Sequence, residues 1–150
     1  MIDNLRGTYL SNFYESVVLH DGILYRNAEA AFQASKCALP EERLLFQPLL
    51  GAEAKALGKR IRMREDWLEV RTIEMWKVLQ AKFDGHPDLL AKLVATGDEE
   101  IIEGNTWNDK FWGVCNGEGR NHLGTMLMAI RKLGKFKQEG YTITEWEIME

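Results

Sequence analysis

The residues best suited to chemistry lie in a segment from residue 103 to residue 124. This segment places Trp107 and Trp112 on either side of Asp109, among glycines and asparagines that follow neither a helical nor a strand period. Aromatic faces can stack on a base or a sugar, and a carboxylate can exchange protons or stabilise positive charge. Two interpretations stay open: a ligand-binding loop, or an ordinary surface loop whose tryptophans dip into the core.

A second polar group lies on a helix that is expected to follow Asn27. At about 100° per residue, Glu29, Gln33 and Lys36 fall on one side of this helix. The other side carries small residues that allow close packing, namely Ala30, Ala31, Ala34, Cys37 and Ala38. The polar row is either a solvated helix face with loose ion pairs or one wall of a cleft.

The composition favours a single globular domain over residues 1–150. Forty-five per cent of the residues are hydrophobic and twenty-eight per cent are charged, and a chain of this length can bury a sizeable core. The formal charge of −4 argues against non-specific nucleic-acid binding. A basic run, formed by Lys55, Lys59, Arg60, Arg62 and Arg64, is either a solvated helix face or a local positive rim.

Several function classes have no support in the sequence. The apolar runs are too short for a membrane span, and the N-terminus lacks the pattern of a signal peptide, which favours a cytoplasmic location. Cys37 and Cys115 are expected to be buried thiols. Neither they nor the histidines have the spacing of metal ligands, so we expect no metal site. The oligomeric state is left open.

Local patterns predict a mainly helical α+β domain with a small antiparallel sheet. Asp21-Gly22 predicts a hairpin between strands 16–20 and 23–26, with residues 8–14 extended beside it. A strand over 141–148 would make the sheet from the two chain ends. The expected helices are 28–39, capped by Asn27; 52–63; 67–83, with a capping box of Asp66 and Glu69; 87–95; and 122–138, capped by Asn121.

Six sequence blocks, in this order, resemble the YbiA/NADAR family of N-glycosidases. They are 7–14 (GTYLSNFY), 22–36 (GILYRNAEAAFQASK), 81–83 (AKF), 96–98 (TGD), 108–113 (NDKFWG) and 119–128 (GRNHLGTMLM) with Arg131. The resemblance implies a YbiA-like fold. It also implies hydrolysis of the bond between a ribose carbon and a nitrogen, without a cofactor or a metal.

The resemblance leaves the substrate open between two ribosylated compounds. One is the set of phosphoribosylated amino-pyrimidine intermediates of riboflavin synthesis, and the other is ADP-ribose attached to guanine in nucleotides or nucleic acid. The partner would accordingly be a small ribosylated base or nucleotide, or an ADP-ribosylated nucleic acid. A non-catalytic module that binds ADP-ribose is the alternative from another class.

The resemblance also implies which residues form the site. Breaking a ribosyl C–N bond passes through an oxocarbenium-like state. Asp109 would supply the negative charge facing the ribose, and Glu29 would be the acid or base, with a pKa raised by burial. Lys36 would bind a phosphate or attack the opened sugar as an amine. The expected substrate contacts are Ser11, Asn12, Phe13, Gln33, Lys82, Trp107, Trp112, Gly113 and Asn121. The candidates for phosphate contacts are Arg6, Lys82 and Arg131.

Overall fold

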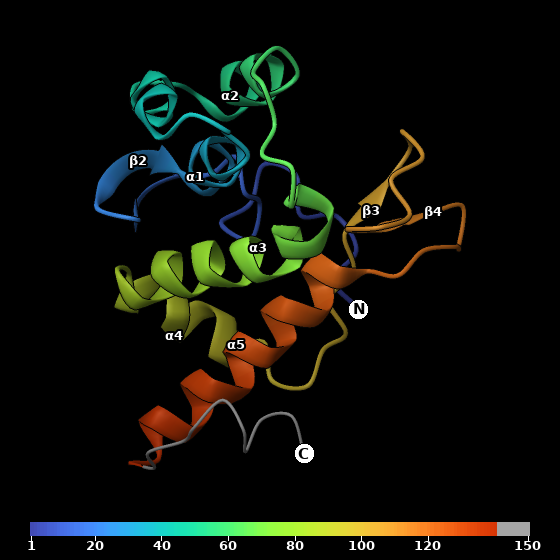
Figure 1. The fold of residues 1–150 in the computed structure, drawn as a ribbon. Helices are drawn as coiled ribbons and strands as arrows, with labels where there is room; N and C mark the ends of the chain where they lie inside the picture. The colour runs from blue at the N-terminus through green and yellow to red at the C-terminus, as the bar shows by residue number, and fades with distance from the viewer. Residues whose placement is uncertain (141–150) are drawn as a thin grey trace. The chain divides into compact units, whose positions relative to one another are not determined.

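The computed structural model describes residues 1–140, which group into two compact units (Figure 1). One unit runs from Arg6 to His86, and the other combines Met1–Leu5 with the chain from Pro87 onward. The strand predicted over 141–148 lies outside the described residues. A single domain over 1–150 stays a prediction.

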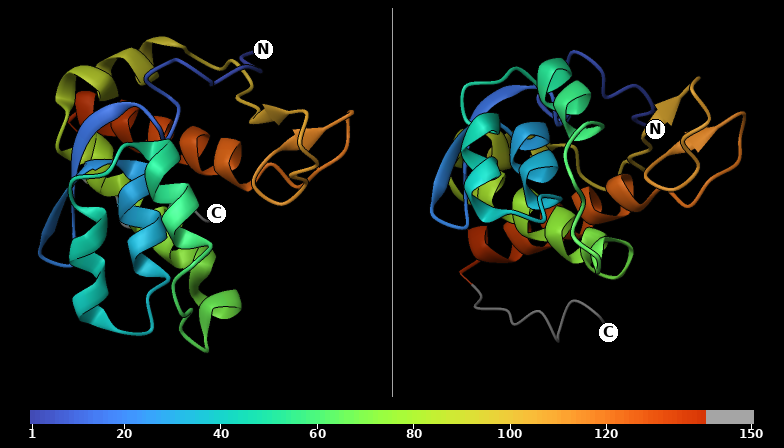
Figure 2. Two further views of the ribbon diagram at one scale, coloured as in Figure 1. Left: turned by 90° about the horizontal axis from the view of Figure 1, so that it is seen from above. Right: turned by 45° about the horizontal axis from the view of Figure 1, so that its top comes forward.

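The first element of the Arg6–His86 unit is the predicted hairpin. Strands β1 (Glu15–His20) and β2 (Ile23–Asn27) pair antiparallel, as the blue hairpin in Figure 2 shows. In their register Leu19 lies opposite Leu24. Asp21 and Gly22 both have positive φ, 47° and 82°. This is the backbone that a two-residue type I′ turn requires, so the sequence signal was sufficient to predict the hairpin.

Residues 8–14 form a series of turns, so the extended strand predicted there is wrong. The hydroxyl oxygen of Thr8 accepts a hydrogen bond from Leu10 N at 3.2 Å. That of Ser11 accepts from Phe13 N at 3.1 Å. Such side-chain bonds to the local backbone compete with strand pairing. They bring Ser11, Asn12 and Phe13 into one compact turn.

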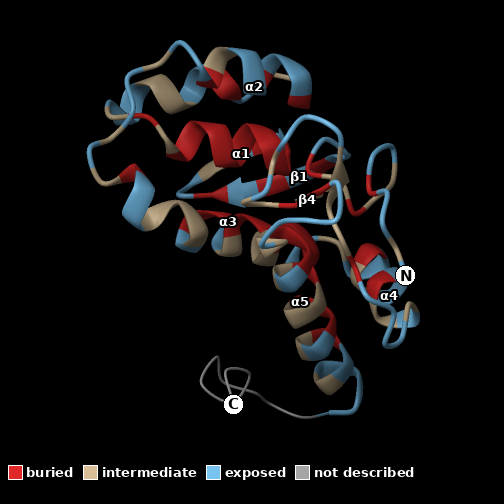
Figure 3. Ribbon diagram, turned by 90° about the vertical axis from the view of Figure 1, so that its right-hand side faces the viewer, coloured by how far each residue is buried: buried red, intermediate tan, exposed pale blue. Residues whose placement is uncertain are grey.

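Helix α1 (Ala28–Ser35) is buried along its whole length (Figure 3). The predicted cap is confirmed, because Asn27 Oδ1 accepts from Ala30 N at 2.7 Å. The helix ends earlier than the predicted residue 39. Ala38 N donates instead to Arg62 O at 2.9 Å, so a pairing distant in sequence replaces the last helical turn.

The rest of this unit is helical. It contains the 3-10 helix η1 (Pro40–Phe46), helix α2 (Gly51–Gly58), which stops short of the predicted residue 63, and helix α3 (Trp67–Asp84). The α3 bounds agree with prediction within one residue, but the capping box is wrong. The Asp66 carboxylate binds the Arg64 guanidinium at 2.7 and 3.0 Å in place of the helix backbone.

The second unit is built on helices α4 (Pro87–Ala95) and α5 (His122–Gln138), both at their predicted positions. They pack against each other where Gly134 meets the side chains of Leu90 and Val94. Short strands β3 (Gly104–Asn105) and β4 (Val114–Cys115) pair in parallel, a sheet that the sequence did not indicate. The mainly helical α+β class is confirmed. Within residues 1–140, no helix combines the length and apolarity needed to cross a membrane.

Candidate active site

The buried end of the predicted polar row is a hydrogen-bonded pair on α1. Glu29 and Gln33 are 8% and 5% exposed, and Glu29 Oε1 accepts from Gln33 Nε2 at 2.8 Å. Burial raises the pKa of Glu29, while the Gln33 bond and the charges of Lys55 and Lys36 act in the opposite direction. The solvated-face interpretation is therefore wrong for these two residues. Burial therefore favours the protonated form of the Glu29 carboxyl.

Lys36 ends the row at the C-terminus of α1, where it is half-buried. Its Nζ lies 5.9 Å from the ring centroids of Phe32 and Trp67. Burial lowers the pKa of Lys36, and the negative charge of Glu29 opposes this shift. A lowered pKa increases the fraction of neutral amine, the form of lysine that acts as a nucleophile.

The Ser11–Phe13 turn is fastened to the start of α1. Glu29 N donates to Asn12 O at 2.9 Å, so the turn and the carboxylate are positioned together. Two buried amide oxygens, Asn12 Oδ1 and Gln33 Oε1, have no hydrogen-bond partner among the described residues. Buried acceptors of this kind are suited to the hydroxyl or amino groups of a ligand.

The side chain of Lys82 stabilises the Ser11–Phe13 turn by hydrogen bonds to the local backbone. The side chain is fully buried, and Nζ donates to Tyr9 O at 2.6 Å and to Ser11 O at 3.0 Å. Burial lowers the pKa of Lys82 to about 7. Because Nζ donates to backbone carbonyls, we propose that Lys82 holds this turn in position. The resemblance had instead implied a contact of Lys82 with the phosphate or the substrate.

In the other unit, Asp109 organises the loop around itself. Its Oδ1 accepts from Phe111 N at 3.1 Å and from Trp112 N at 3.0 Å. Asn105 holds the backbone of Asp109 from the other side, donating to Asp109 O at 2.8 Å and accepting from Asp109 N at 3.0 Å. This role of Asn105 could not be predicted from the sequence, because its side chain bonds a backbone four residues on, beyond the reach of the usual asparagine turn. Asp109 is half-buried.

The two tryptophans of the loop differ. Trp107 is 51% exposed, so the interpretation that it dips into the core is wrong. Trp112 is half-buried and joins an aromatic cluster. The ring of Phe111 lies 4.8 Å from Trp112, edge to face, and 4.6 Å from the ring of His122. The cluster fixes the loop at the start of α5.

Asn121 and Gly113 are part of the loop scaffold. Asn121 stands at the N-terminus of α5 with a positive φ of 52°, and its side chain does not cap that helix. It accepts from Glu103 N and donates to Ile101 O, both at 2.9 Å. A Cβ on Gly113 would collide with Glu103 O, so this position requires glycine. Their ligand contacts stay predictions.

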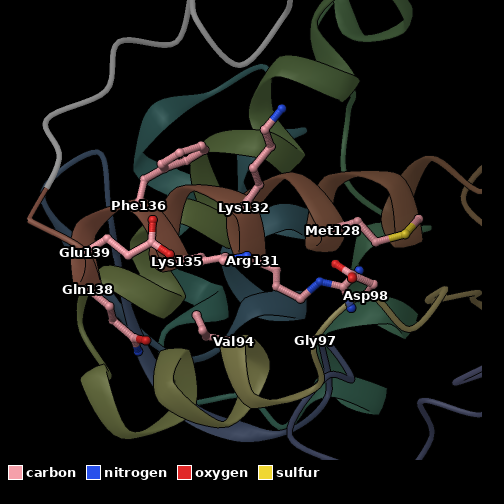
Figure 4. A pocket seen from close by; sticks show the side chains of 10 residues that line it. All are labelled: Val94, Gly97, Asp98, Met128, Arg131, Lys132, Lys135, Phe136, Gln138 and Glu139. Carbon is pink, nitrogen blue, oxygen red and sulfur yellow. The ribbon is translucent and has the colours of Figure 1, made fainter.

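A cavity of about 690 Å³ in the same unit is lined by residues of α4, α5 and the loop after α4 (Figure 4). None of the predicted site residues lines it except Arg131, a candidate for a phosphate contact. Arg131 Nη1 donates to Thr96 Oγ1 at 3.0 Å and to Glu99 O at 2.7 Å. Arg131 therefore fastens the loop after α4 to α5.

A buried histidine on β1 also has charged neighbours. His20 Nε2 lies 2.8 Å from Glu74 and 3.6 Å from Asp21, and these three groups are close enough together to hold a cation. Arg64 lies 3.8 Å from Glu74 and Arg43 lies 3.5 Å from Asp21. With two guanidinium groups already on the carboxylates, we interpret the cluster as an ion-pair network.

The predicted site residues thus form two sets, one in each unit. The set in the Arg6–His86 unit joins Glu29, Gln33 and Lys36 to the Ser11–Phe13 turn. The other set joins Asp109 and Trp112 in the loop before α5, with Trp107 exposed on the same loop.

Comparison with known proteins defines the class. A family model described as the NADAR domain matches residues 3–133, and the chain belongs to this family. The protein named N-glycosidase YbiA in Escherichia coli is 34% identical over 127 residues, which are 81% of this chain and 78% of that protein. N-glycosidase Npun_R5314 of Nostoc punctiforme is 35% identical over 130 residues, covering 81% and 82%.

Two further relatives extend the comparison. The protein named Riboflavin biosynthesis protein VVA0006 of Vibrio vulnificus is 33% identical over 131 residues, which are 83% of this chain and 35% of that protein. The NMR structure of E. coli YbiA matches with a TM-score of 0.79 at 29% identity, over 97% of this chain and 93% of that one. The fold is therefore YbiA-like.

Proposed function

We propose that this protein is an N-glycosidase that hydrolyses the ribosyl C–N bond of phosphoribosylated amino-pyrimidine intermediates of riboflavin synthesis. Relatives that align with most of this chain are named N-glycosidases, and another is named for riboflavin biosynthesis. The structural observation that carries the proposal is the buried Glu29–Gln33 pair with half-buried Lys36 on the same helix. This row offers a carboxyl group whose pKa is raised by burial and an amine whose pKa is lowered by burial.

Glu29 is suited to the proton transfers of this hydrolysis. As the C–N bond breaks, the protonated carboxyl gives its proton to the departing nitrogen, and positive charge develops on the ribose. A nucleophile then takes the place of the departed nitrogen at the anomeric carbon, water supplies the final oxygen of the sugar, and a proton returns to Glu29. The products are the free amino-pyrimidine and the ribose phosphate, and Glu29 ends in its starting state. Gln33 orients the carboxyl throughout.

Lys36 has two possible roles, and its surroundings favour one of them. As a neutral amine it attacks the anomeric carbon of the opened sugar, and a bond to the enzyme forms while the bond to the departing nitrogen breaks. Water then hydrolyses this adduct and regenerates the amine. The lowered pKa of Lys36 supports this role over that of a phosphate contact, which needs the charged form. Asp109 is proposed to stabilise the positive charge on the ribose.

The test is to incubate the purified protein with a phosphoribosylated amino-pyrimidine and, separately, with ADP-ribosylated guanosine. We expect the first compound to be cleaved to free amino-pyrimidine and ribose phosphate. The kcat/KM for this cleavage should be higher than that for cleavage of the ADP-ribosylated guanosine. Preference for the guanosine compound would transfer the activity to ADP-ribose removal. Tight calorimetric binding of ADP-ribose with no turnover of either compound would favour a binding module.

A further inference from the structure

Helix α2 approaches the Glu29–Gln33–Lys36 row very closely. Helices α1 and α2 pack together (Figure 1). Gly58, the last residue of α2, lies against the side chain of Gln33. A Cβ at Gly58 would collide with Gln33 Oε1 and would lie 2.8 Å from Gln33 Cδ. The absence of a side chain at Gly58 therefore allows Gln33 to keep its present position. The contact places the C-terminal end of α2 beside the proposed catalytic residues.

The chain that follows α2 is fastened to the C-terminal end of α1. Ala38 N donates to Arg62 O at 2.9 Å, and Arg64 N donates to Lys36 O at 2.8 Å. The basic run noted in the sequence thus borders the polar row, with its backbone bonded to the residues around Lys36.

Lys55 and Lys59 are the members of this run whose charge reaches the row. They are four residues apart, flank Gly58 and are exposed. The charge of Lys55 acts to lower the pKa of Glu29, and the charges of both lysines act to lower that of Lys36. The charge of Lys36 also acts to lower the pKa of Glu29. Positive charge from α2 and its C-terminus therefore adds to that of Lys36 at the row.

We propose that Lys55 and Lys59 bind the phosphate monoester of the substrate at the edge of the Glu29–Lys36 row. The proposal rests on the proposed function and assigns the phosphate to residues other than the three arginine and lysine candidates of the sequence analysis. A phosphate monoester carries nearly two negative charges and accepts several hydrogen bonds. Two flexible ammonium groups four residues apart, at the C-terminal end of α2, suit such a ligand.

The test compares wild-type protein with the double variant Lys55→Met/Lys59→Met on the phosphoribosylated amino-pyrimidine and on its dephosphorylated riboside. Lys77→Met is the control, because Lys77 is an exposed lysine on α3 in the same unit. In the double variant we expect KM for the phosphorylated compound to rise about tenfold or more, the scale of one to two lost charge-assisted contacts. KM for the riboside should not change in the double variant. In the Lys77→Met control, KM should not change for either compound. An equal change on both compounds, or no change on either, would overturn the proposal.

A second readout is independent of turnover. Ribose 5-phosphate should raise the Tm of the wild type and of Lys77→Met, and the rise should disappear in the double variant. This result would support the phosphate site even if neither ribosylated compound is cleaved. The phosphate site and the proposed function can therefore fail independently. If ribose 5-phosphate does not protect the wild type, or if the double variant loses affinity for an oligonucleotide and not for ribose 5-phosphate, the assignment is wrong.

Discussion

Replacing Gly58 by alanine should disturb Glu29 through Gln33. The new Cβ would overlap the amide of Gln33, which is the flexible end of a side chain and can move away. Because Gln33 is only 5% exposed, it has little room, and moving away breaks its 2.8 Å bond to Glu29. We therefore expect Gly58→Ala to affect the chemistry of a residue that it does not touch.

The size of the effect follows from two opposing contributions. Losing a hydrogen bond to a charged or buried carboxyl costs about 1.5–3 kcal/mol. Alanine in place of a helical glycine returns about 1 kcal/mol. The free energy of unfolding should fall by about 0.5–2 kcal/mol, which corresponds to a Tm lower by roughly 1–8 °C for a chain of this size.

The pH dependence gives the sharper readout. The Gln33 bond acts to lower the pKa of Glu29, against the larger effect of burial. Loss of the Gln33 bond should raise the pKa of Glu29 further. The part of the kcat–pH profile that reflects the titration of Glu29 should therefore move to higher pH. Gln33→Ala makes room for the new methyl group, so adding Gly58→Ala to Gln33→Ala should cost little more. Unchanged stability and pH profile in Gly58→Ala, or additive losses in the double variant, would refute this reasoning.

Three further predictions concern single side chains. Burial raises the pKa of Glu29 in the folded state. Between the unfolded-state and folded-state pKa values the folded protein binds more protons, so wild-type stability falls as pH rises through that window. In thermal melts the Tm of Glu29→Gln should therefore exceed that of wild type by more at pH 8 than at pH 4, while its activity is lost. The folded Lys82 pKa of about 7 lies below the unfolded value, so wild-type stability should increase between pH 7 and 10. Lys82→Met should lack that increase and, without the two hydrogen bonds from Nζ to Tyr9 O and Ser11 O, its free energy of unfolding should be lower by about 1–3 kcal/mol. A parallel pH dependence of the two proteins in urea titrations would contradict this. Asp109→Asn keeps the oxygen that accepts from Phe111 and Trp112 and loses the charge, so kcat should fall about 10²–10⁴-fold with Tm retained, whereas Asp109→Ala should also lower Tm. Glu118→Gln, an exposed loop residue, is the control, and near-normal turnover in Asp109→Asn would restrict Asp109 to a structural role.

Local signals predicted the elements that depend on local physics. The hairpin follows from the turn chemistry of Asp-Gly, the start of α1 from the Asn27 cap, and helices α3, α4 and α5 from apolar spacing. The caps predicted for α3 and α5 are wrong. The early end of α1 does not, because Ala38 pairs with Arg62, a residue far along the chain. No periodicity in the sequence reports such a pairing.

The site was predictable to a similar extent. The spacing of Glu29, Gln33 and Lys36 placed them on one side of a helix, and the structure shows the first two hydrogen-bonded there. Spacing did not show that this side is buried, because burial depends on α2 and on the Ser11–Phe13 turn. It also did not show that Lys82 points inward, since a lysine is expected at the surface unless its donors are satisfied.

The most direct test of the central claim is single-turnover release of the amino-pyrimidine from its phosphoribosylated form, followed in wild type and in Glu29→Gln. We expect stoichiometric release by the wild type and a rate about 10²–10⁴-fold lower in the variant, the range for a positioned acid or base. Substrate binding should persist in Glu29→Gln, because losing the carboxyl group affects the transition state more than the bound substrate. No release by the wild type, or equal rates in the two proteins, would contradict the assignment of Glu29 as the group that handles the proton in ribosyl C–N cleavage.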